Sequence, residues 1–134
     1  MEIKVFTENG RVPVTVMHVD GNIDSSTYGA FQEQADLAIK GGTRHILVDL
    51  AHTKFVSSAG LRTLNNIFNQ LRAIDPESKL TDAEVQKGIS AGTYKSPQLK
   101  ILNLSSDVRT AFELAGFDMF IETFTDMQTA IASF

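Results

Sequence analysis

Two adjacent serines, Ser57 and Ser58, stand between an apolar stretch and a helical pattern in residues 53–66, TKFVSSAGLRTLNN. One serine is enough to cap a helix, because a single hydroxyl accepts a free backbone N–H of the first turn. The other hydroxyl could carry a phosphoryl group, which the free N–H groups and the dipole at a helix start favour. The pair therefore has two interpretations: a cap with a spare hydroxyl, or a phosphorylation switch.

Phosphorylation at this position would change the surface more than the fold. Phosphoserine carries about −1.5 to −2 charges at neutral pH. A partner that buries the start of the helix would have to desolvate this charge or face it with its own, and like charges at an interface cost several kcal/mol. Because about 1.4 kcal/mol is tenfold in affinity, one phosphate is enough to dissociate a tight complex.

Gly60 lies in the same helical pattern, where glycine costs roughly 0.5–1 kcal/mol relative to alanine. This cost indicates that the position requires a residue without a side chain, because another group approaches its backbone closely. Backbone from elsewhere in the domain or from a partner protein could make that close approach, and the sequence leaves both open.

Residue patterns typical of enzymes are missing from the sequence. The three histidines, His18, His45 and His52, lack the spacing of a helical metal site, and no serine lies in a G-x-S-x-G elbow. The chain has no glycine-rich phosphate loop and no cysteine for thiolate chemistry, a disulfide or a metal site. We therefore expect a protein that is not an enzyme and that needs no metal and no cofactor.

The composition is that of one globular domain over residues 1–134, with 43% hydrophobic and 21% charged residues. The 12 basic and 16 acidic residues give a net charge of −4 without a basic cluster, so we expect no nucleic-acid partner. The N-terminus MEIKVFTENG lacks the apolar core of a signal peptide, and no stretch approaches the ~20 apolar residues of a membrane span. We expect a soluble, cytoplasmic protein with no membrane partner. The sequence does not determine its oligomeric state.

Strand and helix patterns alternate along the chain. Apolar and β-branched runs predict strands at residues 3–6, 12–19, 45–50, 99–104 and 120–124. Apolar residues at helical spacing predict helices at residues 28–39, 57–74, 107–115 and 127–134. Asn9-Gly10 is a hairpin signal, and Pro13 suits an edge or a strand start. The order predicts an α/β fold with a mixed sheet, mostly parallel with an antiparallel first strand, and four to five α-helices.

Capping residues predict where two of the helices begin. Asp24, Ser25 or Ser26 could cap the first helix. Thr125 could cap the last one, because Gln128 follows it at the distance of a capping box.

Residues 75–98 interrupt the alternation, because they contain few large apolar residues and several prolines and glycines. Thr81 and Glu84 have capping-box spacing and predict a short helix over residues 82–87. A connection this long inside a compact domain is usually functional or mobile, and the alternative is a tolerated surface insertion.

Three segments in this order resemble the STAS domain family of anti-anti-sigma factors, also called anti-sigma factor antagonists. DGNIDSSTYGAFQEQADLAI is similar to the family's turn and first helix, and HILVDLAHTKFVSSAGLRTL to its central strand, loop and switch segment. DVRTAFELAGFDMFIETFTDMQTAI is similar to its closing helix, strand and helix. The resemblance covers nearly the whole chain except residues 75–98 and implies a STAS-like sheet.

The switch segment of the family usually ends in Phe-x-Asp-Ser-Ser-Gly-Leu-Gly. Phe55 falls on its phenylalanine, and Ser58 falls on the serine that a partner kinase phosphorylates. Ser57 replaces the aspartate, which makes Ser57 a second candidate acceptor, Gly60 matches a glycine, and Arg62 replaces the second glycine.

The resemblance implies a phosphorylation-switched module that binds an anti-sigma factor serine kinase and so frees a sigma factor for transcription. A serine phosphatase would reverse the modification. The candidate partner-binding residues are Asn22, Asp24, Ser57, Ser58, Gly60, Leu61, Arg62 and Asn65. The alternative is a STAS module without a switch, either a scaffold or a ligand-sensing subunit of a signalling or transport complex.

Overall fold

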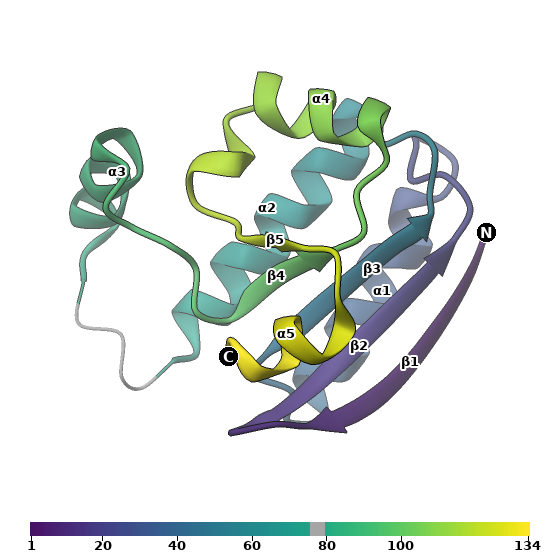
Figure 1. Ribbon diagram of the computed structural model, residues 1–134, viewed down its shortest axis with the longest axis horizontal. Helices are drawn as coiled ribbons and strands as arrows, with labels where there is room; N and C mark the ends of the chain where they lie inside the picture. The colour runs from purple at the N-terminus through teal and green to yellow at the C-terminus, as the bar shows by residue number, and fades with distance from the viewer. Residues whose placement is uncertain (76–79) are drawn as a thin grey trace.

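A five-stranded sheet with the strand order β1-β2-β3-β4-β5 forms the centre of the computed structural model, which describes residues 1–75 and 80–134 (Figure 1). β1 is antiparallel to β2 and the other pairs are parallel, as the sequence predicts. The strands are β1 (Glu2–Asn9), β2 (Pro13–Asp20), β3 (Ile46–His52), β4 (Leu99–Leu102) and β5 (Thr123–Phe124). The helices are α1 (Tyr28–Lys40), α2 (Ser58–Ala73), α3 (Asp82–Ala91), α4 (Ser106–Leu114), the 3-10 helix η1 (Phe117–Met119) and α5 (Met127–Ala132).

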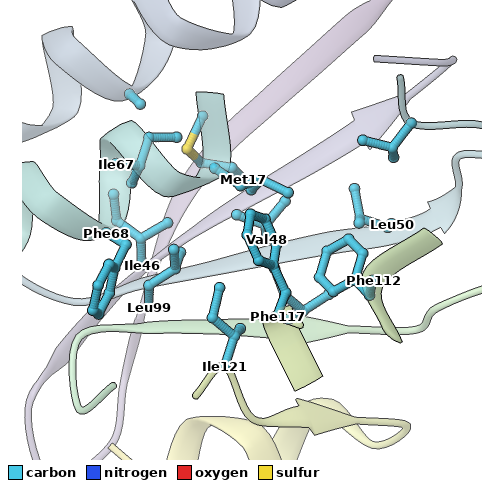
Figure 2. Packing of buried hydrophobic residues seen from close by; sticks show 14 of the residues in the cluster. Met17, Ile46, Val48, Leu50, Ile67, Phe68, Leu99, Phe112, Phe117 and Ile121 are labelled. Atoms are coloured by element: carbon cyan, nitrogen blue, oxygen red, sulfur yellow. The ribbon is translucent and has the colours of Figure 1, made fainter. Parts of the chain in front are cut away.

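The main core fills the space between one face of the sheet and the helices α1, α2 and α4 (Figure 2). Because side chains alternate along a strand, Met17 and Val48 point to this face while their neighbours point to the other. The helices contribute large fully buried side chains, among them Phe31 and Phe112. Apolar residues at helical spacing thus place α2 firmly against the sheet.

The opposite face of the sheet is covered by α5 over a smaller apolar cluster, which contains Val14, Val16, Leu47, Leu102, Ala130 and Ile131. Lys100 of β4 lies beneath this helix with only 4% of its surface exposed. Its Nζ donates hydrogen bonds to the Ser133 carbonyl at 2.8 Å and hydroxyl at 3.0 Å, and lies 3.3 Å from a Glu122 carboxylate oxygen. Lys100 therefore ties the C-terminal end of the chain to the sheet.

The predicted strand over residues 120–124 is mostly wrong. Residues Phe117–Met119 form η1, and only Thr123–Phe124 pair with β4. Phe120 and Ile121 are buried in the main core instead, because rings from α4, η1 and α2 gather there. An apolar run does not distinguish a strand from a turn that packs inward.

Two of the predicted caps are also wrong. Thr27 occupies the N-cap position of α1, while the Asp24 carboxylate accepts hydrogen bonds from Ser26 in the preceding turn. Asp126, not Thr125, caps α5 by accepting the Thr129 N–H at 2.8 Å. In both cases the N-cap lies one residue after the nearest predicted one.

The helix predicted within residues 75–98 exists and is longer than predicted. Thr81 and Glu84 form the capping box, and the helix continues to Ala91. It ends at Gly92, which adopts the left-handed conformation with φ of 73°. Residues 76–79 of this segment lie outside the described residues.

Replacing Lys100 by alanine should lower the free energy of unfolding by about 1–3 kcal/mol, because α5 loses its charged hydrogen bonds to β4. Urea denaturation measures the loss, and hydrogen exchange at the amides of α5 shows whether this helix opens first. Lys87→Ala is the matched control, since Lys87 is exposed on α3. Equal stability of the two variants would contradict the anchoring role of Lys100.

Candidate functional site

The two serines take different positions at the start of α2. Ser57 is the N-cap, and its hydroxyl accepts the Gly60 N–H at 3.3 Å. Ser58 is the first residue of the helix and is exposed to solvent. Within residues 1–75 and 80–134, no hydrogen bond engages the Ser58 hydroxyl. Of the two hydroxyls, only Ser57 therefore has a structural function.

The loop after β2 holds the start of α2 in place. The Ser57 N–H donates to the Ile23 carbonyl at 2.8 Å, and the Ile23 N–H donates to the Phe55 carbonyl at 3.1 Å. The Asn22 side-chain oxygen accepts the N–H groups of Lys54 and Phe55, at 3.2 and 3.1 Å. These bonds form a short parallel bridge beyond the carboxyl ends of β2 and β3. Hydrogen bonds between the loop after β2 and the loop after β3 thus fix the position of Ser58.

Gly60 makes the close approach that its place in a helix predicts, and the neighbour belongs to the same domain. A Cβ atom at this position would lie 2.8 Å from the Ile23 carbonyl oxygen and 2.8 Å from Cγ1 of Val56. Gly60 is buried. It therefore positions the helix start, and of the two neighbours that the sequence left open, the structure shows backbone of the same domain.

A groove of about 560 Å³ begins at Ser58 and runs between α2, α3 and the segment around η1. It brings together four of the candidate partner-binding residues, Ser58, Leu61, Arg62 and Asn65, with residues outside that set. The additional lining residues are Phe68, Asn69, Gln86, Ile89, Ser90, Ala115, Gly116, Phe117, Met119 and Phe120. Among the described residues that line this groove, Arg62 is the only charged one, so this lining is positively charged.

The segment of residues 75–98 contributes a wall of this groove through α3. The helix is fixed by the buried side chain of Val85 and by an ion pair between Arg72 of α2 and Asp82, at 2.7 Å. Figure 1 shows α3 standing apart from the sheet, at the side where α2 ends. Among the described residues, the insertion therefore forms the wall of the groove beside the later turns of α2, while Ser58 lies at the other end of the groove.

Asn22 and Asp24 were predicted to bind a partner, and they do not line the groove. Asn22 is exposed and holds the loop, as described above. Hydrogen bonds donated by the Ser26 hydroxyl and N–H lower the pKa of the Asp24 carboxyl, so it is ionised at neutral pH. The structure thus divides the predicted residues into a groove and a supporting loop.

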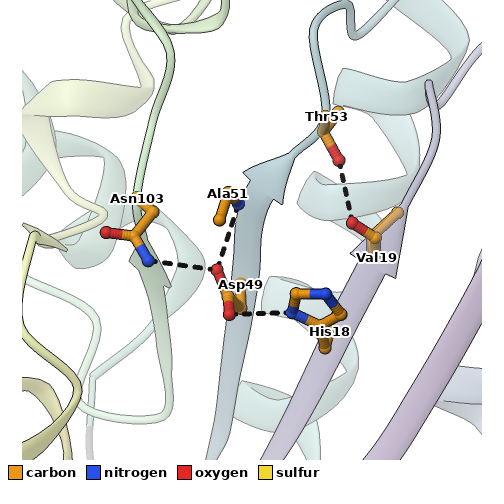
Figure 3. A network of polar contacts seen from close by, with 6 residues as sticks. All are labelled: His18, Val19, Asp49, Ala51, Thr53 and Asn103. Carbon is orange, nitrogen blue, oxygen red and sulfur yellow. Dashed lines mark hydrogen bonds and ion pairs between the residues drawn. The ribbon is translucent and has the colours of Figure 1, made fainter.

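A second cluster of polar residues lies on the same face of the sheet as α5 (Figure 3). The Asp49 carboxylate lies 2.9 Å from Nδ1 of His18 and accepts hydrogen bonds from Nδ2 of Asn103 and the N–H of Ala51. Both carboxylate oxygens of Asp49 thus have partners, which suits a structural role for this buried residue. Across the described part of the chain, no three acidic, histidine or cysteine side chains are grouped to hold a metal ion.

Comparison with known proteins identifies the family. A family model described as the STAS domain matches residues 4–86, more than half of the chain, so the protein belongs to the STAS domain family. No curated protein matches the sequence significantly. None of the helices in the described ranges is both long and apolar enough to cross a membrane.

Solved structures of anti-sigma factor antagonists share the fold at low sequence identity. One from Mycobacterium paratuberculosis is 18% identical with a TM-score of 0.67, covering 98% of this chain and 93% of its own. Unphosphorylated SpoIIAA is 14% identical with a TM-score of 0.61, covering 97% and 94%. The phosphorylated Bacillus cell fate determinant SpoIIAA is 15% identical with a TM-score of 0.63, covering 97% and 96%. The mixed sheet and its helices are thus those of the SpoIIAA-like STAS fold.

Removing the cap hydroxyl in Ser57→Ala should cost about 1 kcal/mol of stability, because the Gly60 N–H loses its acceptor. The melting temperature should fall by ~4 °C for a domain of this size. Ser58→Ala should change the stability by less than about 0.5 kcal/mol, since the Ser58 hydroxyl is exposed. Equal losses in the two variants, measured by calorimetry, would contradict this division of roles.

Introducing a methyl group in Gly60→Ala should destabilise the protein by about 1–2 kcal/mol, although alanine favours a helix. The reason is the distance of 2.8 Å that the new Cβ would have to the Ile23 carbonyl. Gly29→Ala in α1 is the matched control, because its Cβ would meet nothing within 4 Å. This control should gain about 0.5–1 kcal/mol in urea denaturation. A stabilised Gly60→Ala variant would show that the contact is not tight.

Proposed function

We propose that this STAS domain is an anti-sigma factor antagonist and that Ser58 is its phosphorylation site. In the unphosphorylated state it binds an anti-sigma factor that is also a serine kinase, which frees a sigma factor for transcription. The kinase uses ATP to phosphorylate Ser58 and is then released, and a serine phosphatase restores the binding form. The domain needs no cofactor of its own for this cycle, which takes place in the cytoplasm.

The different positions of the two hydroxyls carry the choice of Ser58 over Ser57. A kinase must reach a free, exposed hydroxyl, and Ser58 offers one at the first position of α2. Ser57 is half-buried, and its hydroxyl is already used as the N-cap of the same helix. Modifying Ser57 would therefore remove a cap, whereas modifying Ser58 leaves the cap in place.

The backbone around Ser58 suits a phosphoryl group. In the first turn of α2 the Gly60 N–H donates to the Ser57 hydroxyl and the Leu61 N–H to the Ser57 carbonyl. The N–H groups of Ser58 and Ala59 have no acceptor within the described chain. They lie at the positive end of the helix dipole, where a phosphate is stabilised. The fold should therefore tolerate the modification without rearrangement.

The charge of the groove explains how the modification would act as a switch. Arg62 lies one helical turn after Ser58 and is the charged residue of the lining described above. Unmodified, the lining carries one positive charge and suits an acidic partner surface. A phosphoryl group adds about −1.5 to −2 charges, so the sign of the groove reverses. An acidic surface that binds the unmodified groove would then be repelled.

Incubation with the anti-sigma factor kinase that co-purifies with this protein, together with ATP, should add one phosphate, which intact mass spectrometry detects. Ser58→Ala should abolish the modification, because it removes the acceptor. Ser57→Ala is the matched control and should still be modified at Ser58. Modification that persists in Ser58→Ala and disappears in Ser57→Ala would move the site to Ser57.

The same purification separates this proposal from the alternative of a STAS module without a switch. Two observations favour the alternative. Ser57 and Arg62 depart from the family's usual switch segment, and α3, which lines the groove, belongs to residues 75–98, the segment outside the family resemblance. An ATP-binding serine kinase among the bound proteins supports the antagonist. An ATPase permease complex, without modification of either serine, supports a scaffold subunit.

A further inference from the structure

β1 is a long edge strand whose outer side carries no other element. It has eight residues, from Glu2 to Asn9, and pairs only with β2. Figure 1 shows it at the margin of the sheet, with no described segment beyond it. Two large apolar side chains at its centre are exposed: Val5 by 41% and Phe6 by 40%. An edge of this kind presents unpaired backbone groups that can pair with another chain.

The hydrogen bonds of β2 determine which groups of β1 face outward. The Thr15 N–H donates to the His45 carbonyl next to β3, so Thr15 turns its backbone groups away from β1. Its neighbours Val14 and Val16 turn theirs toward β1, where they face Glu8 and Phe6. The even-numbered residues of β1 therefore use their backbone groups on β2. The N–H and C=O groups of the odd-numbered residues, Ile3, Val5, Thr7 and Asn9, point to the free edge.

We propose that two copies of this chain associate through their β1 strands, antiparallel and with Phe6 facing Phe6 of the second copy. Lys4 and Glu8 lie on the same face of β1, two residues before and two residues after Phe6. In this register each Lys4 faces Glu8 of the second copy, so two ion pairs flank the central pair of rings. The interface has twofold symmetry, as expected for a homodimer.

Charge complementarity selects this register over the neighbouring ones. Because only odd-numbered residues offer outward groups, the pairing can shift only so that odd residues again face odd residues. One such shift places Lys4 opposite Lys4 of the second copy, another places Glu2 opposite Glu8, and a third pairs Glu8 with Phe6. The one other register that pairs opposite charges, with Glu2 facing Lys4, joins only residues 2–4 of each strand, so the proposed register is the longest one with complementary charges. Charged side chains on an edge strand usually oppose pairing, but here they are complementary to a second copy.

Sedimentation equilibrium at low ionic strength tests the dimer by charge exchange. Lys4→Glu and Glu8→Lys each replace two attractive pairs by two repulsive ones, so each should raise the dimer dissociation constant about tenfold or more. The two substitutions change the net charge in opposite directions, so a general charge effect cannot explain a loss in both. The double variant Lys4→Glu/Glu8→Lys restores opposite charges and should regain the dimer.

Glu2→Lys is the matched control for Glu8→Lys, because Glu2 would face Gly10 of the second copy. It should leave the dimer constant unchanged, and circular dichroism should show all variants folded. A monomer at every concentration, or a dimer that is insensitive to the single exchanges, would overturn the proposal. Failure of the double variant to regain the wild-type constant would overturn it as well.

Cysteine cross-linking tests the register itself, since the chain has no cysteine of its own. In the proposed register the two Phe6 Cα atoms lie about 4.5 Å apart, within the range of a disulfide. Phe6→Cys should therefore form a covalent dimer under mild oxidation, faster than Val5→Cys or Thr7→Cys. Faster cross-linking at position 5 or 7 would contradict the proposed register.

Discussion

The approach of the Gly60 backbone to the Ile23 carbonyl is the contact on which the functional end of this domain depends. At 2.8 Å from that oxygen there is no room for a Cβ atom, so the first turn of α2 lies directly on the loop after β2. The same carbonyl accepts the Ser57 N–H, which links the cap of the helix to the loop. One glycine thus allows a loop and a helix start to share their hydrogen bonds, and the exposed Ser58 follows from that geometry.

The sheet explains why the loop and the helix start meet. Parallel strands bring the segments after their carboxyl ends to one edge of the sheet, where α/β proteins commonly place their binding sites. The loops after β2 and β3 therefore lie side by side, and Asn22 of one binds backbone groups of the other. The two faces of the sheet are filled differently, with α1, α2 and α4 on one and α5 on the other. The main core supports α2 along its length and leaves its start exposed.

Local patterns predicted most of the fold. The hairpin at Asn9-Gly10, the capping box of Thr81 and Glu84, and the alternation of strands and helices all depend on residues close in sequence. The strand predicted at residues 120–124 failed because its burial comes from α4 and α2, which no local pattern reveals. The two capping errors were small, since each N-cap lies one residue after the nearest predicted one. They arose because Asp, Ser and Thr can each fill the N-cap position, and several of these residues are adjacent in the sequence.

The candidate site was predicted only in part, for the same physical reason. The serine pair and Arg62 belong to one segment, so their proximity follows from helical spacing. The neighbour of Gly60 and the wall formed by α3 come from other segments, and the sequence left both open. The close approach predicted at Gly60 was nevertheless confirmed, because this glycine, which is unfavourable in a helix, does lie against the Ile23 carbonyl.

In the proposed function, the insertion would take part in recognition through the groove that α3 lines. A flat helix start presents one serine and one arginine to any partner with a matching charge. With α3 opposite, the same residues lie in a groove whose other wall carries Gln86, Ile89 and Ser90. A partner must then match the shape of that groove as well as its charge, and shape mismatch excludes proteins that charge alone would admit. Since Arg72 and Asp82 hold α3 to α2, the wall and the switch segment belong to one helix pair. In the proposed function, residues 75–98 would therefore contribute selectivity for one partner among related ones, while phosphorylation of Ser58 would control whether that partner binds.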